Sequence, residues 1–124
     1  MDRIIISMDS KAEDLTSLAL CVHTLTGGMP VTARSRNYPG VQIEEGRVRS
    51  KVYTGPILEQ ALAENRMIKG KPREGDYKGI PVTVAPILLN GLAIAAIGVV
   101  DTTGALDFKA QMDQYARLEK QVGR

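Results

Sequence analysis

The chain carries two groups of residues whose types and spacing are suited to chemistry, and the first follows its most apolar segment. Residues 92–100 are nearly all apolar, and Asp101, Thr102, Thr103 and Gly104 come directly after them. A carboxylate beside two hydroxyls at the end of a buried strand predicts a ligand-binding site or a site of acid-base chemistry. An ordinary strand end followed by a helix start uses the same residue types, because threonine caps helices and glycine permits turns.

The segment from Asp101 to Gly104 approaches two catalytic motifs but departs from both. An aspartic protease half-site carries Asp-Thr-Gly, whose tight loop brings two carboxylates together, whereas an extra threonine stands between Asp101 and Gly104. A phosphate-accepting aspartate in Asp-Lys-Thr-Gly has a lysine where this chain has Thr102. The remaining functional interpretation is binding, in which Thr102 and backbone N–H groups at the start of a helix hold an anion.

The second group is cationic. In the segment 30–36, a period of two places Arg34 and Arg36 on one face of a predicted strand. The segment 41–53 predicts one or two further strands, and one face there carries Arg47, Arg49, Lys51 and Tyr53. If these strands pair, several guanidinium groups lie within reach of one carboxylate or phosphate. A solvated sheet face and an RNA-binding surface are the alternatives.

The combined prediction is a ligand-binding site for a small anion. Its residues are Arg34, Arg36 and Tyr53, with Asp101 and Thr102 at the rim. No residue is assigned a catalytic role in this prediction, and no pattern identifies a cofactor. The chain has one cysteine and one histidine, so we expect no disulfide within the chain and no metal site.

Composition narrows the class of protein. A chain of 124 residues predicts a single domain over residues 1–124. A net charge of +2, with four Tyr, one Phe and no Trp, argues against a nucleic-acid partner. Asn90-Gly91 interrupts the apolar run 87–100, which is shorter than the roughly 20 residues of a membrane helix. No signal-peptide pattern is present, so we expect a cytoplasmic protein without membrane contact.

Periodicity predicts the elements that position these residues. Apolar residues at helical spacing predict a helix over residues 11–26, which Gly27-Gly28 ends. A second helix starts at Thr54-Gly55-Pro56, and a short strand is predicted over residues 67–69. Asn90-Gly91 predicts a tight hairpin between two long apolar strands, of which the second, residues 92–100, is central. A final amphipathic helix is predicted beyond Gly104.

This order predicts an α+β fold. We expect an antiparallel sheet of about five strands, with helices at the N-terminus, in the middle and at the C-terminus, on one side of the sheet. Pro81 and Pro86 remove ladder donors from the first strand of the long hairpin, which predicts an edge or a bulge there. The arrangement is similar to PAS, GAF and Cache sensory domains, an analogy of fold that does not establish function.

Three phrases carry a resemblance to a known family. They are PVTARSRNYPGVQIEEG, YTGPILEQAL and YKGIPVTVAPILLNGLAIAAIGVVDTTGALDF. Together, from about Asp9 to Phe108, they resemble the domain-of-unknown-function family 2111 of methanogenic archaea. The resemblance implies a methanogen cytoplasm and assigns no catalytic residue.

The preferred function is therefore a non-enzymatic small-molecule-binding or sensory module of a methanogenic archaeon, acting as a homodimer. One alternative is a small enzyme that uses Asp101 as acid or base. Another is an assembly subunit of a methanogen protein complex.

Overall fold

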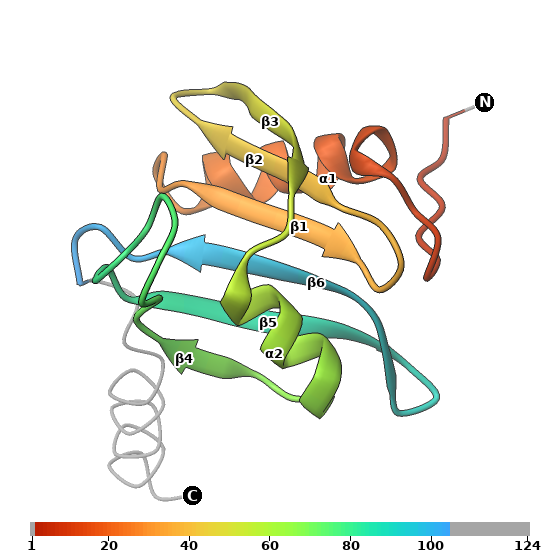
Figure 1. Cartoon of the computed structure of the whole chain (residues 1–124). Coiled ribbons are helices and arrows are strands. Elements are labelled where there is room, and N and C mark those ends of the chain that lie inside the picture. Colours follow the sequence, from red (N-terminus) through yellow and green to blue (C-terminus); the bar gives the residue numbers. More distant parts are fainter. Residues whose placement is uncertain (1, 105–124) are drawn as a thin grey trace, which may run out of the picture.

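The computed structural model describes residues 2–104, so the helix expected beyond Gly104 lies outside the described residues. Two helices and six strands are described (Figure 1). In chain order they are α1 (Ala12–Leu25), β1 (Val31–Ser35), β2 (Gly40–Glu44), β3 (Arg47–Tyr53), α2 (Pro56–Glu64), β4 (Ile68–Gly70), β5 (Val82–Leu89) and β6 (Leu92–Val100). The expected α+β class is confirmed. Neither helix of this part of the chain is long and apolar enough to cross a membrane.

The strands form one antiparallel sheet in the order β3-β2-β1-β6-β5-β4. The sheet has six strands where about five were expected, because the segment 41–53 folds into two strands joined by a turn at Glu45-Gly46, both of which have positive φ. β6 lies between β1 and β5, which confirms its predicted central position. A strand that is apolar on both faces belongs there because both of its faces are covered.

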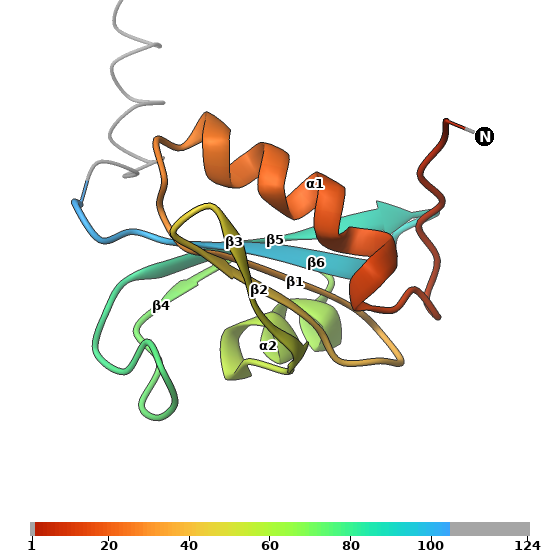
Figure 2. The same cartoon turned by 90° about the horizontal axis from the view of Figure 1, so that it is seen from above.

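The helices lie on opposite faces of the sheet, not on one side as the sequence led us to expect (Figure 2). α1 packs on β1 and β2, whereas α2 packs on β6 and β5. Two features of the chain place the helices on opposite faces: the connection that contains α2 and the apolar surface that α1 covers. α2 joins β3 at one edge to β4 at the other and must cross a face of the sheet, and α1 already occupies the opposite face over the apolar side chains Val31 and Ala33.

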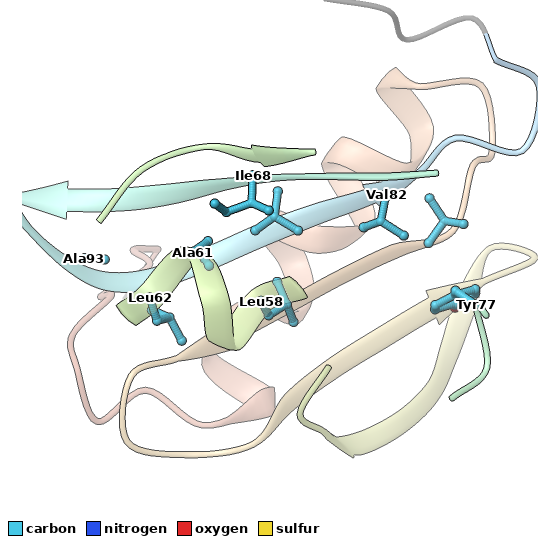
Figure 3. Close-up of a cluster of buried hydrophobic side chains, with 10 residues drawn as sticks. Leu58, Ala61, Leu62, Ile68, Tyr77, Val82 and Ala93 are labelled. Atoms are coloured by element: carbon cyan, nitrogen blue, oxygen red, sulfur yellow. The ribbon is translucent and has the colours of Figure 1, made fainter. Parts of the chain in front are cut away.

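Each face has its own apolar core. On the α1 face, Leu15 and Ala19 pack against side chains of β1 and β2 such as Ile43. On the α2 face, Leu58, Ala61 and Leu62 point toward strands β4, β5 and β6, and Tyr77 lies at the far end of the cluster (Figure 3). On β6, Gly98 has no side chain, which leaves room for side chains of both neighbouring strands: a Cβ there would lie 2.9 Å from Val84 Cγ2 and 3.0 Å from Thr32 Oγ1.

The β5–β6 hairpin follows the predicted turn chemistry. Asn90 and Gly91 both have positive φ, of 54° and 80°, as a type I′ turn requires. Pro86 lies beyond the three residues of β5 that pair with β4, so its missing N–H removes no bond to β4. The register shifts after Ile87 because β6 carries one extra residue, Ile94. This bulge places Ala93 in the core of the α2 face, beside Ala96.

Candidate functional site

A hollow of about 640 Å³, open to solvent and lined mostly by exposed residues, lies between β3, the first turn of α2 and the loop 71–81. We call it the β3–α2 cavity. It is lined by Gln42, Arg49, Ser50, Val52, Tyr53, Thr54, Gly55, Pro56, Glu59, Glu74, Gly75 and Asp76. Its volume lies within the range of small-molecule sites, roughly 300–1,000 Å³. The lining combines an aromatic ring, a proline and several charged groups, which is suited to binding a small polar molecule.

A hydrogen-bonded cluster underlies the cavity, and three of its members, Gln42, Arg49 and Asp76, line the floor. Gln42 on β2 is 2% exposed, and its Nε2 donates to Tyr77 Oη at 2.8 Å and to Asp76 Oδ2 at 3.0 Å. The Tyr77 hydroxyl donates in turn to Glu44 Oε2. Arg49 on β3 closes the cluster with a 2.6 Å ion pair from Nη1 to Glu44 Oε1. Because each buried polar group here has a partner, the floor is rigid and holds its donors and acceptors in fixed positions.

The cluster keeps Glu44 ionised and its tyrosines neutral. Burial alone would raise the pKa of Glu44, but hydrogen bonds from Tyr77 and Arg49, together with the charge of Arg49, hold it below its ordinary value of 4.5. Burial and the hydrogen bond to Glu44 raise the pKa of Tyr77. Burial, followed by the nearby carboxylate of Asp76, raises the pKa of Tyr53. At neutral pH, both phenols are therefore hydrogen-bond donors rather than phenolates.

The backbone at the start of α2 shapes the wall of the cavity. Tyr53 stacks at a tilt on Tyr77, with ring centroids 6.2 Å apart, and its ring covers Gly55. A Cβ on Gly55 would lie 2.6 Å from Tyr53 Cε2, and the φ of Gly55 is +66°, so only glycine fits there without strain. Gly55 is the N-cap residue of α2 and has no side chain to cap the helix, and Pro56 follows it in the first turn. The N-terminal end of α2 therefore faces the cavity without a capping side chain.

Of the five residues in the combined prediction, Tyr53 lines this cavity, and Arg49 of the predicted cationic face lines it as well. Arg36 lies at the other end of α2, about 13 Å along the helix axis. Its Nε donates to Ala93 O at 2.8 Å, and its Nη2 donates to Leu62 O at 2.6 Å and Asn65 Oδ1 at 3.3 Å. Asn65 Oδ1 also accepts the N–H of Ala93 at 2.7 Å. The guanidinium thus connects the end of α2 to the bulge of β6.

The other predicted site residues are dispersed as well. Arg34 donates from Nε to Ser35 O at 2.9 Å and from Nη2 to Arg36 O at 3.3 Å. β2 lies between β1 and β3, so Arg34 and Arg49 are not on neighbouring strands. Asp101 is 7% exposed at the far end of β6, where its N–H donates to Pro81 O, and Thr102 beside it is exposed. The five residues therefore do not form one site.

Sequence reasoning missed the floor of the cavity. Gln42 is the internal polar residue between Val41 and Ile43, and a buried polar residue in a strand needs a partner. That signal was present in the sequence, but its partners Asp76 and Tyr77 lie 34 and 35 residues away in a loop. No local pattern identifies them.

The groups at the cavity are hydrogen-bonding and charged side chains. In the part of the chain from residue 2 to 104, no group of three or more His, Cys, Asp or Glu side chains is placed to hold a metal ion. His23 is buried elsewhere in the structure. Its Nδ1 forms a 2.7 Å hydrogen bond with Met29 O, and its Nε2 accepts the N–H of Gly46 at 3.0 Å. The cavity itself offers phenol, amide, carboxylate and guanidinium groups at fixed positions.

Comparison with known proteins places the chain among archaeal proteins. Residues 22–103 match the family described as "Uncharacterized protein conserved in archaea (DUF2111)". An uncharacterized protein of Methanocaldococcus jannaschii is 41% identical over 103 residues, which cover 83% of this chain and 79% of that protein. The match spans α1 from Val22 through β6 and includes every residue that lines the β3–α2 cavity. The chain belongs to this archaeal family, DUF2111.

Proposed function

We propose that the protein is a non-enzymatic binding or sensory module that holds a small polar molecule in the β3–α2 cavity. The observation that carries the proposal is the combination of a 640 Å³ cavity with a hydrogen-bonded polar floor. Pockets of this size that present a few fixed polar groups beside apolar walls are the usual form of small-molecule sites. The similarity to PAS, GAF and Cache sensory domains is part of this proposal and rests on the general layout of sheet and helices.

Rigidity of the floor supports binding. Gln42 and Tyr77 are 2% and 5% exposed, and they are held by the loop that carries Asp76 and by β2. A site whose side chains are fixed before binding loses little conformational entropy when the ligand arrives. The position of the site differs from the one expected on sequence grounds, since the donors of Arg34 and Arg36 are directed to backbone carbonyls.

A pair of variants on β3 tests the proposal. Ser50 lines the cavity, whereas its neighbour Lys51 does not. Ser50→Trp should fill the cavity, and Lys51→Trp adds the same side chain outside it as a matched control. Native mass spectrometry of the full chain, incubated with small-molecule extract of an archaeal lysate, should show an added mass on wild type and Lys51→Trp.

The expected result is loss of that mass in Ser50→Trp with retained folding by circular dichroism. Equal ligand retention by both variants would place the bound molecule elsewhere and refute the proposal, as would a bare mass for all three proteins. The same spectra report whether the chain is the homodimer expected from sequence.

A further inference from the structure

The charged side chains that line the β3–α2 cavity are unbalanced. Three carboxylates line it, Glu59 from α2 and Glu74 and Asp76 from the loop 71–81, against one guanidinium, that of Arg49. Arg49 is itself paired with Glu44 behind the cavity wall. A cleft lined mainly by one sign of charge concentrates the field inside it and attracts ligands of the opposite sign. The cavity therefore favours a ligand that carries more positive than negative charge.

The three carboxylates are available to such a ligand. Within residues 2–104, the side-chain ion pairs closer than 4.0 Å are Glu44–Arg49 and Glu64–Arg66, and neither includes Glu59, Glu74 or Asp76. Asp76 accepts a hydrogen bond from Gln42, which fixes its position without neutralising it. A metal ion does not fit these carboxylates, since no group of three or more in this part of the chain is arranged for one. An organic cation does fit, because two ammonium groups joined by a flexible aliphatic stem can each bind a different carboxylate.

The cavity also has groups that attract negative charge. Arg49 uses Nη1 for Glu44, and its side chain is 57% exposed, so its other N–H donors face solvent at the cavity wall. The first turn of α2, which has no side-chain cap, lies at the same cavity. Guanidinium and helix N-terminal N–H groups both bind carboxylates. One anionic group on the ligand is therefore accommodated beside its cationic groups.

Three residues give the wall of the cavity apolar surface as well. Val52, Tyr53 and Pro56 line the cavity, and the Tyr53 ring is held in place by Tyr77 and Gly55. A flat aromatic ring of this kind packs against aliphatic chains and attracts ammonium groups over its face.

We propose that the ligand is a basic α-amino acid of the lysine or arginine type, with two cationic groups, one carboxylate and an aliphatic stem. This inference rests on the proposed function and specifies its ligand class. The carboxylate binds Arg49 and the start of α2, the cationic groups bind the carboxylates of Glu59, Glu74 and Asp76, and the stem lies along Tyr53.

Four probes that differ by one charged group test the assignment by isothermal titration calorimetry on the full chain. L-Lysine has all three charges, 1,5-diaminopentane lacks the carboxylate, 6-aminohexanoate lacks the α-ammonium, and L-norleucine lacks the side-chain ammonium. L-Lysine or L-arginine should bind about fivefold more tightly than each of the three truncated probes, since each lost charge pair at a partly exposed site costs on the order of 1 kcal/mol.

Variants assign each charge to its partner. Arg49→Gln should lower the affinity for L-lysine to that for 1,5-diaminopentane, while Arg49→Lys should retain part of the difference. Glu74→Gln should weaken L-lysine but leave L-norleucine nearly unchanged if Glu74 binds the side-chain ammonium. Glu64→Gln is the matched control, since Glu64 lies at the far end of α2, outside the lining of the cavity.

The outcomes separate this inference from the proposed function. Equal affinity for L-lysine and 1,5-diaminopentane would overturn the amino-acid assignment, because the carboxylate would then contribute nothing. If neither L-lysine nor L-arginine binds while a lysate ligand is still lost from Ser50→Trp, the inference fails and the proposed function stands. If no ligand of any kind depends on Ser50, both fail.

Discussion

Replacing Arg36 by methionine tests whether this residue stabilises the fold or binds an anion. The guanidinium donates to two backbone carbonyls, Ala93 O and Leu62 O, and to Asn65 Oδ1. Methionine keeps an apolar stem of similar length but offers no donor, so these acceptors lose their partner. A buried acceptor without a partner costs about 1–3 kcal/mol. Arg36 is half-buried, so we take the lower half of that range for the two carbonyls and expect a loss of about 2–4 kcal/mol.

Urea denaturation followed by circular dichroism measures this loss directly. At about 4 °C per kcal/mol for a chain of this size, the same loss lowers Tm by about 8–16 °C. Arg34→Met is the matched control, because Arg34 donates only to carbonyls within two residues of itself and should cost below about 1 kcal/mol. An Arg36→Met protein as stable as wild type would refute the structural role. Loss of anion binding at unchanged stability would favour the anion site expected from sequence.

Two further changes probe the floor of the cavity and the β1–β2 turn. Because its folded pKa lies below its ordinary value of 4.5, Glu44 contributes stability that is present above the unfolded pKa and lost as pH falls through the folded pKa. Glu44→Gln should therefore flatten the dependence of the urea midpoint on pH between about pH 3 and 6, and an unchanged acid slope would contradict the assigned hydrogen bonds. Gly40→Ala should destabilise the protein by more than about 3 kcal/mol or prevent folding, since the new Cβ would lie 1.7 Å from Ala33 O. Soluble expression and a thermal melt check this, and a wild-type Tm would show that the two strands separate more easily than their contact implies.

Local chemistry allowed several elements to be predicted from sequence. The hairpin at Asn90-Gly91 followed because both residues tolerate positive φ, which few others do. The central position of β6 followed from its apolar residues on both faces. In each case the deciding interaction lies within a few residues or depends only on how apolar the segment is.

The candidate site could not be predicted from local sequence patterns. Arg36 has the composition of an anion-binding residue, but its partners lie 26 and 57 residues away, and the bulge in β6 that exposes the Ala93 carbonyl is itself a consequence of pairing with β5. Likewise, Gln42, Arg49, Glu59 and Asp76 meet at one cavity only because α2 crosses the sheet on the face opposite α1.

The sequence by itself determined the types of element, the tight hairpin and membership of the archaeal family, because these depend on residue preferences over short stretches and on identity along the chain. Tertiary structure decided which face each helix covers, which arginine faces solvent and where the cavity opens. These follow from packing between segments far apart in the chain, where the free energy of burial and of paired polar groups depends on neighbours that no local pattern specifies.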